Sequence, residues 1–375
     1  MKTFIGTDTA FDIVHLPKSI AEATVEFIPM KKLIFTLPNG ERIALDDIEQ
    51  MRRIGFDTAS PEYFNNYLNS LISFFGQGGP VNIPNTYDTP DGLASISFAE
   101  NFLVTPLVFM LASEYGDNAA YIRYKNVTKS GFDAVIVEPS NYDGAHAEQT
   151  VSYFAFLPGK YNLGSITIEV GYIDTKKVQG DYAPAGNDIG WDRVTLSQNY
   201  TNLSVITSIQ TMNNEQNDVP TTISTPWMTP TVKIVDDRSF DITLDMSETS
   251  EGIISIPERI AYVAFSSNQQ TTFTDSNGNS IKAETLNPTN VVGWDDGGTD
   301  ITLNNNYDSK PLMVASLNSR DSSEGGWLRI DDTKSSKTSL NLKIDHDSTQ
   351  NTERNHTAET AGMLVISESF TLKNN

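Results

Sequence analysis

Two of the four histidines stand at matching places near the ends of two similar segments of the chain. His146 lies close before Glu148, and His356 lies close before Glu359. An imidazole beside a carboxylate can bind a metal ion or a polar ligand, and it can equally form a structural hydrogen bond that fixes its loop. A third similar segment has Ser255 at the matching place, which favours the structural interpretation. We expect no metal site and no cofactor, and we keep both histidines as candidates for ligand contact.

Aromatic side chains in polar segments are a second group of candidates. Trp227 and Trp327 each follow a turn-rich stretch, and a loop tryptophan can stack on a sugar ring while its indole N–H donates a hydrogen bond. Each could instead begin a strand and fill a core, and the sequence leaves both interpretations open. Tyr142 and Asp143 lie in the loop that carries His146, so we add them to the candidate ligand-binding residues.

Closely spaced carboxylates offer a possible catalytic chemistry, since glycosidases hold two carboxyl groups across a cleft. Such groups occur at Asp295–Asp296, Asp331–Asp332 and at Asp345 with Asp347. Neighbours on strands and turns point in different directions, and in an acidic chain such groups are usually solvated. The chain has no Gly-x-Ser-x-Gly, no His-Glu-x-x-His and no Walker motif. We therefore expect a protein that is not an enzyme.

The elements that must position these residues occur as three similar segments. Each has an aromatic residue, then a short apolar run, and later a closing run with period-two alternation, which is typical of strands. The later two segments also carry a Gly-Trp pair, at Trp191 and Trp294. The closing runs are residues 149–156, 258–265 and 359–366.

This pattern predicts a mainly β fold of three tandem antiparallel β-sandwich domains, at residues 91–180, 181–285 and 286–375. Residues 1–90 differ, with a predicted hairpin at 32–45 and two predicted helices, at 46–54 and 60–75. We therefore expect a small α+β N-terminal module there. The stretch 76–92 is rich in Gly, Pro and Asn and predicts a linker.

Composition excludes several classes of protein. The chain of 375 residues has a formal net charge of −22, which argues against binding to nucleic acid or to a bare anionic membrane. It has no cysteine, so neither a disulfide framework nor a cysteine zinc site is possible. The first residues lack the apolar stretch of a signal peptide, and no run is long enough to span a bilayer, so we expect no membrane insertion.

The repeated segments resemble the H-type lectin domain. The resemblance rests on the Gly-Trp pairs, on Arg123 before residues 125–128, on Gly131–Phe132 opening a strand, and on residues 153–156 near the close. It implies six-stranded antiparallel sandwiches, which in that family often trimerise and bind sugars, and related modules are found in bacteriophage tail parts. Where that family has Trp and Asp contacts to sugar, this chain has residues 141–146, so galactose-type specificity has no support.

From these observations we expect a structural and adhesive virion protein, a phage tail-fibre, baseplate or spike component that contacts host surface glycans. Its expected partners are copies of itself, with a trimer favoured, and other virion proteins bound through residues 1–90. The alternative is a carbohydrate-binding lectin on the bacterial surface or secreted from the cell. Gene neighbours would separate the two.

Overall fold

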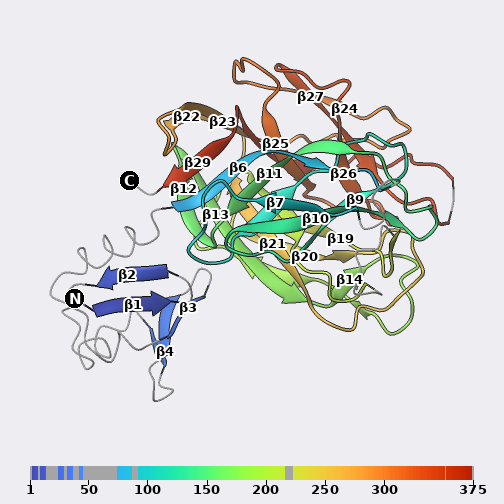
Figure 1. Ribbon diagram of the computed structural model, residues 1–375. Coiled ribbons are helices and arrows are strands. Elements are labelled where there is room, and N and C mark those ends of the chain that lie inside the picture. Colours follow the sequence, from blue (N-terminus) through green and yellow to red (C-terminus); the bar gives the residue numbers. More distant parts are fainter. Residues whose placement is uncertain are drawn as a thin grey trace. The chain divides into compact units, whose positions relative to one another are not determined.

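The computed structural model describes residues 74–86, 92–215, 225–350 and 352–373, together with the backbone of short strands in the first 44 residues and at 223–224. The chain divides into two units (Figure 1). One comprises Met1–Ser73 with Asn374–Asn375, and the other comprises Phe74–Lys373.

The N-terminal unit contains two small antiparallel sheets. One pairs β1 (Lys2–Gly6) with β2 (Thr9–Ile13), and the other has the order β3 (Thr24–Ile28), β4 (Lys32–Thr36), β5 (Arg42–Ala44). The pairing of β4 with β5 confirms the predicted hairpin at 32–45. The helix predicted at 46–54, and the one predicted at 60–75 as far as residue 73, lie outside the described residues.

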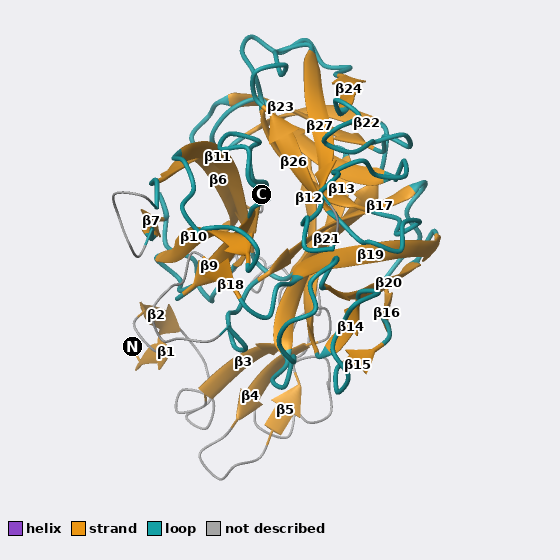
Figure 2. Ribbon diagram, turned by 90° about the vertical axis from the view of Figure 1, so that its right-hand side faces the viewer, coloured by secondary structure: helices purple, strands orange, loops and turns teal. Residues whose placement is uncertain are grey.

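The described residues form strands and loops without a helix, so the prediction of a mainly β protein is confirmed (Figure 2). In this part of the chain there is accordingly no helix with the length and hydropathy that a membrane span requires. The sheets of residues 74–373 fall into three pairs of matching strand order. We name the sequence around each pair repeat 1 (residues 74–157), repeat 2 (158–267) and repeat 3 (268–373).

Each repeat has one four-stranded inner sheet in which the closing strand is central. The closing strands are β11 (Gln149–Phe156), β21 (Glu258–Ser266) and β28 (Ala361–Ile366). The strand orders correspond in all three. They are β29 (Phe370–Lys373), β6 (Phe74–Ile83), β11, β8 (Leu107–Met110); then β12 (Gly159–Leu163), β13 (Ile166–Thr175), β21, β17 (Leu203–Ile209); then β22 (Gln269–Thr274), β23 (Ser280–Leu286), β28, β25 (Leu312–Leu317).

Each repeat also has an outer sheet built on a hairpin. The hairpins are β9 (Tyr121–Lys125) with β10 (Gly131–Pro139), β19 (Thr229–Asp236) with β20 (Ser239–Asp245), and β26 (Trp327–Asp331) with β27 (Ser339–Asp345). A further strand pairs with the second hairpin strand: β7 (Ala94–Ser97), β16 (Asp192–Thr195) or β24 (Thr299–Thr302). The edges of the first two outer sheets also hold β14 (Lys177–Gln179), β15 (Asp188–Ile189) and β18 (Ile223–Ser224).

Aromatic and aliphatic side chains fill the space between the two sheets of each repeat. The Tyr153 ring on β11 lies 5.8 Å from the Phe132 ring on β10, and the Tyr262 ring on β21 lies 5.2 Å from Phe240 on β20. In repeat 3 the core between the two sheets is a cluster of buried apolar side chains that contains Met363 and its neighbours on β28 and β27. The alternation predicted for residues 151–156 therefore places Tyr153 toward the outer sheet, while Phe154 on the opposite face is also fully buried.

The three repeats close into a ring around their equivalent strands β8, β17 and β25, which contact one another. Gln210, just after β17, donates to the Val108 carbonyl and accepts from the Val108 N–H. Asn318, just after β25, makes the same pair of bonds with Val205. Ser152 of repeat 1 accepts from the Met313 N–H of repeat 3, at 3.3 Å. Repeat 2 is thus bonded to repeat 1, repeat 3 to repeat 2, and repeat 1 to repeat 3.

The predicted linker at 76–92 is wrong, because β6 spans Phe74–Ile83 and is a central strand of the first inner sheet. Its glycines allow aromatic rings to lie against the backbone. A Cβ on Gly78 would stand 2.6 Å from the Phe370 ring and 2.7 Å from the Phe154 ring, and one on Gly76 would stand 2.6 Å from Phe156. Glycine is needed here because aromatic rings pack closely against the backbone, and not because the chain must be flexible.

The boundaries predicted for the sandwiches do not fall between the sheets. Residue 285 lies inside β23, and residue 180 lies between strands of one outer sheet. The reason is that the inner sheets of repeats 2 and 3 take their first two strands, and that of repeat 1 takes β6, from the segment before the predicted start. In repeat 1, the place of β12 and β22 is filled by the C-terminal strand β29. The last strand of the chain therefore completes the first repeat.

Candidate functional site

The candidate residues lie mainly in loops at one end of the ring, which we call the loop end. It consists of the loops that adjoin the first residues of the closing strands. These loops are 111–120, 140–148, 180–187, 210–215, 246–257, 318–326, 346–350 and 352–358.

One buried side chain at the start of each closing strand holds the neighbouring loop. Gln149 accepts from the Ser113 N–H and donates to the Tyr115 carbonyl. Glu258 accepts from the N–H groups of residues 213 and 214, and Glu359 from those of residues 321 and 322. Because hydrogen bonds from backbone N–H groups to a carboxylate are stronger than neutral ones, these contacts fix the loops.

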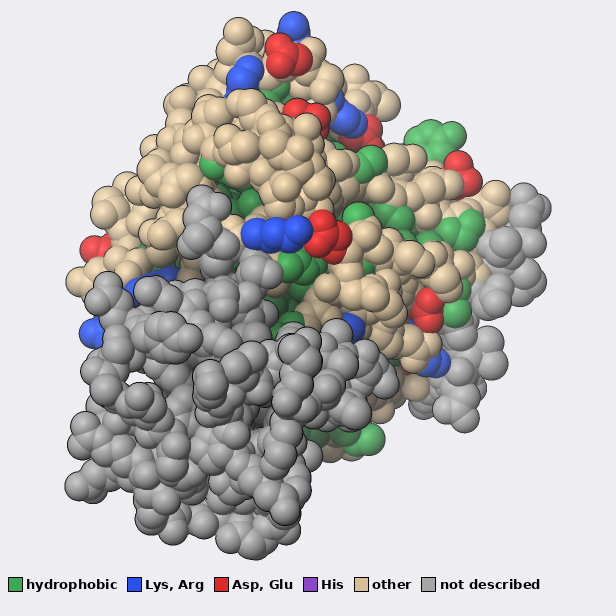
Figure 3. Space-filling view, turned by 60° about the vertical axis from the view of Figure 1, so that its left-hand side comes forward, with side chains coloured by type: hydrophobic (Ala, Val, Ile, Leu, Met, Phe, Trp, Pro, Cys, Tyr) green, Lys and Arg blue, Asp and Glu red, His purple; other side chains and the backbone are tan. Residues whose placement is uncertain are grey.

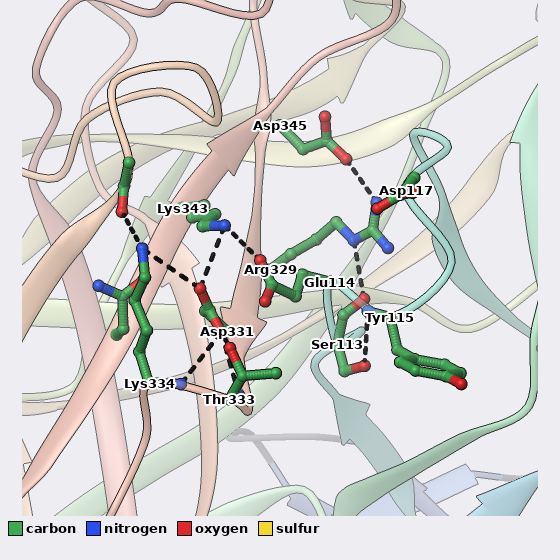
Figure 4. A network of polar contacts seen from close by, with 12 residues as sticks. Ser113, Glu114, Tyr115, Asp117, Arg329, Asp331, Thr333, Lys334, Lys343 and Asp345 are labelled. Atoms are coloured by element: carbon green, nitrogen blue, oxygen red, sulfur yellow. Dashed lines mark hydrogen bonds and ion pairs between the residues drawn. The ribbon is translucent and has the colours of Figure 1, made fainter.

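A buried arginine joins repeat 3 to the first loop of repeat 1 (Figure 4). Arg329 on β26 is fully buried; its Nε donates to the Ser113 carbonyl at 2.8 Å and its Nη1 donates to the Asn118 carbonyl at 2.6 Å. Nη1 also forms an ion pair with Asp345 at 2.8 Å, and Arg354 donates to the other oxygen of Asp345. Burial lowers the pKa of Arg329, and Asp345 opposes that shift.

Similar ion pairs join the other repeats. Arg123 on β9 pairs with Glu215 and donates to the Thr211 carbonyl in the loop after β17. Arg320, in the loop after β25, donates to Asp245 at the end of β20, at 2.7 Å. Each outer sheet thus binds the loop that follows β8, β17 or β25 of the next repeat around the ring.

Beside Arg329, Lys343 lies between the carboxyl groups of Glu114 and Asp331 (Figure 4). Burial raises the pKa of Glu114, and the adjacent Asp331 adds to the shift. Burial also disfavours the charged form of Asp331, but hydrogen bonds from Glu114, Thr333 and Lys343 hold its pKa well below the usual value. A carboxyl of raised pKa next to one of lowered pKa resembles an acid–base pair. Here Lys343 forms ion pairs with both carboxyl groups, so the arrangement stabilises the junction between repeat 3 and repeat 1.

The indole of Trp294 completes this junction. Three cationic side chains lie over its ring, with Arg354 at 3.9 Å, Lys343 at 4.6 Å and Arg329 at 4.9 Å from the centroid. Trp191, the matching residue of repeat 2, has one such neighbour, Lys233 at 5.7 Å. The aromatic face attracts these charges, so the Gly-Trp pairs belong to the scaffold.

The structure places both candidate tryptophans in the core and not on a surface. Trp227 and Trp327 are 1% and 3% exposed, with ring centroids 4.9 Å apart. The Trp327 indole donates to the Ala120 carbonyl at 2.9 Å. Their proposed role in stacking on a sugar is therefore corrected, because no ring face is open to a ligand. The open alternative, that each fills a core, is what the structure shows.

Tyr142 and Asp143 lie together at the loop end. Tyr142 is half-buried against the two tryptophans, and its hydroxyl is 2.9 Å from that of Ser348 in repeat 3. Asp143 is exposed and accepts from the Ala145 N–H at 3.0 Å. Of the residues predicted to bind a ligand, Asp143 is the one whose side chain is open to solvent.

The two candidate histidines are both buried and lie in different loops. His146 is 1% exposed, and its Nδ1 is 3.2 Å from the Ala147 carbonyl oxygen. Burial, with a further effect from Arg329, lowers the pKa of His146 to about 4, so the ring is neutral near pH 7. The ring nitrogens of His356 lie 2.7 Å from the carbonyl oxygens of Thr357 and Gly325. These contacts agree with the structural interpretation of both residues.

Sequence reasoning missed a cluster of Glu324, His346 and Glu353, whose possible ligand atoms all lie within 4.8 Å of one another. The three residues come from loops 318–326, 346–350 and 352–358 of repeat 3. No spacing motif connects residue 324 with residues 346 and 353. The signal that was available is the adjacency of His346 and Asp347 within an acidic stretch.

Glu138 makes the stability of this region depend on pH. Its carboxyl is fully buried, and burial raises the pKa to about 7 although the Gly144 N–H donates to it. Because the folded-state pKa exceeds the unfolded value, the stabilising contribution is present below about pH 4.5 and is lost as the pH rises through 7.

We therefore expect Glu138→Gln to gain stability relative to the native chain between pH 5 and pH 8, by on the order of 3 kcal/mol. His146 titrates in both proteins and cancels in the comparison. Urea unfolding at the two pH values measures this difference. An equal difference between the two proteins at pH 5 and pH 8 would contradict the assignment.

Comparison of the chain with protein-family models, with curated protein sequences and with solved structures found no match.

Proposed function

We propose that this chain is a structural and adhesive virion protein, a phage tail-fibre, baseplate or spike component that contacts neutral sugars on the host surface with its loop end. In this proposal the three sheet pairs are H-type lectin-like sandwiches, and the protein is not an enzyme. The N-terminal unit attaches it to other virion proteins.

The observation that carries the proposal is the position of the exposed apolar side chains. The structure exposes six large ones among the described residues, and four of them lie in loop-end loops: Tyr115, Tyr182, Ile253 and Ile256. Tyr115 is 63% exposed and Tyr182 is 47% exposed. An open tyrosine ring can stack on a sugar while its hydroxyl makes a hydrogen bond. Surface aromatic side chains held on fixed loops suit this kind of contact.

The negative charge of the chain restricts the proposed ligand to the neutral faces of sugars. The net charge of −22 repels phosphate and carboxylate groups of a bacterial envelope. Figure 3 shows a face on which neutral polar side chains and backbone make up most of the described surface, with charged side chains scattered among them. Hydrogen bonds and stacking would then supply the affinity, multiplied by the number of copies on a particle.

The proposed homo-oligomer, with a trimer favoured, needs a surface outside the centre of the ring. Strands β8, β17 and β25 already meet inside one chain, as three sandwiches of a trimer would. We therefore assign self-association to the N-terminal unit, alongside its proposed attachment to the particle.

Binding to host cells or to a glycan array tests this function. Tyr115→Ser and Tyr182→Ser together are expected to weaken binding by at least about tenfold, with an unchanged thermal transition, because each ring loses its stacking surface. The matched control is Val235→Ser, which changes a 44% exposed side chain on the hairpin β19–β20. An equal loss in the control, or full binding in the double variant, would overturn the assignment of the loop end. Absence of binding to any glycan or cell by the native chain would overturn the adhesive function.

A further inference from the structure

The loop end is the most acidic part of the described chain. Its loops contain twelve Asp and Glu residues and two Arg residues. Both arginines are already engaged, Arg320 with Asp245 and Arg354 with Asp345. A cation that enters this region therefore meets an excess of negative charge.

Within these loops Glu324, His346 and Glu353 form a compact group. Each offers one ligand atom, and all three atoms lie within 4.8 Å of one another. The two glutamates are half-buried, while His346 is fully buried. The two carboxylates are thus partly open to solvent, and the nitrogen ligand is the buried member of the group.

Like His356, His346 has a carbonyl oxygen near each of its ring nitrogens, but of these two histidines His346 is the one that also belongs to a group of possible metal ligands among the described residues. Its Nδ1 lies 2.9 Å from the Asp347 carbonyl oxygen, and its Nε2 lies 3.1 Å from the Asn355 carbonyl oxygen. Carbonyl oxygens only accept, and a neutral imidazole has one N–H to donate. With that N–H donated to the Asp347 carbonyl, the lone pair of Nε2 is left beside an oxygen, and a cation bound to both atoms would remove this repulsion.

A metal ion meets this requirement. Metal-binding histidines usually donate their second ring N–H to a carbonyl or carboxylate, as Nδ1 does here. Two ligand atoms bound to one ion at about 2.1 Å stand roughly 3 Å apart, which fits the separation of Nε2 from the Asn355 oxygen. One nitrogen with carboxylate oxygens suits zinc and its neighbours, whereas calcium and magnesium prefer oxygen ligands alone.

We propose that Glu324, His346 and Glu353 form a binding site for one divalent transition-metal ion of the zinc type, which ties loop 318–326 to loops 346–350 and 352–358. The site differs from the sequence-based expectation of no metal. It does not depend on the proposed function, since an ion that orders these loops would do so in any protein with this ring.

Zinc titration of the full chain, stripped with a chelator and followed by calorimetry, tests the site. We expect one Zn²⁺ per chain to bind to the native protein, at least tenfold more tightly than Ca²⁺ or Mg²⁺. Glu324→Gln and Glu353→Gln should each lower the zinc affinity at least tenfold. The matched control, Glu148→Gln, removes an exposed carboxylate from the same loop end and should leave the affinity within twofold.

A second readout is thermal unfolding, which zinc should raise for the native chain and for Glu148→Gln but not for the variant with both cluster glutamates replaced. Absence of stoichiometric zinc binding to the native chain would overturn the proposal. Binding that both cluster variants retain would mean an adventitious ion only, and would equally overturn it.

Discussion

Replacing Phe370 with alanine is expected to lower the free energy of unfolding by about 3–5 kcal/mol, as removal of a large core side chain does. Phe370 is 2% exposed on the last strand, and its ring packs edge-on to Phe154 with centroids 5.2 Å apart. It also lies over Gly78 of β6, so no side chain of β6 can fill the space that it leaves. Chemical unfolding of the full chain measures the loss.

The same strand offers a matched control. Lys373 is exposed on β29 and pairs with Glu100 at the surface, so Lys373→Ala should change stability by less than about 1 kcal/mol. A similar small change for Phe370→Ala would mean that β29 does not complete repeat 1. Closure of the ring by the end of the chain would then be wrong.

Arg329→Met is the second substitution with a large expected effect, a loss of about 3–5 kcal/mol. Methionine preserves much of the volume but leaves the carbonyl groups of Ser113 and Asn118 without this donor. Asp345, which is fully buried, would also lose one of its two arginine partners. The loss follows from the uncompensated polar groups and not from a cavity. Denaturant unfolding with an unchanged slope measures it.

Arg193→Met is the matched control for this substitution. Arg193 forms an ion pair with Asp241 between β16 and β20, but its side chain is 51% exposed. An exposed pair is screened by solvent and contributes little, so the control should remain close to the stability of the native chain. If both variants lost the same small amount, the Arg329 junction would not hold repeats 3 and 1 together.

The sequence predicted the β character and the three similar segments because both are local patterns. Period-two alternation marks each closing strand, and the matched aromatic and apolar runs mark β8, β17 and β25. The position of β6 could not be predicted in this way. A run of glycines is typical of linkers, and only the partners Phe154, Phe156 and Phe370, far away in sequence, show that it is a packed strand.

Closure of the ring also could not be predicted from local sequence patterns. The pairing of β29 with β6 joins the two ends of residues 74–373, and nothing near Phe370 indicates its partner. The predicted sandwich boundaries were displaced for a related reason, since the second strand of each inner sheet (β6, β13 or β23) precedes the aromatic residue used to align the segments.

The candidate site was predicted less well than the fold. The sequence identified the loop before the first closing strand, and Asp143 of that loop is exposed. It could not distinguish a loop tryptophan from a core tryptophan, because the contact between Trp227 and Trp327 forms only when repeats 2 and 3 pack together. It also could not show Tyr115 and Tyr182 as exposed, since the amino-acid type alone does not determine burial.

The most direct test of the proposed attachment protein is immuno-electron microscopy of intact particles from a lysate that contains this chain. We predict that antibodies against loop 246–257 label a tail or surface appendage of intact particles. Antibodies against residues 1–73 should label them only after the particles are dissociated, because that unit is proposed to be the attached part. Labelling of bacterial surfaces with none on particles would contradict the account, and so would labelling of intact particles through residues 1–73 alone.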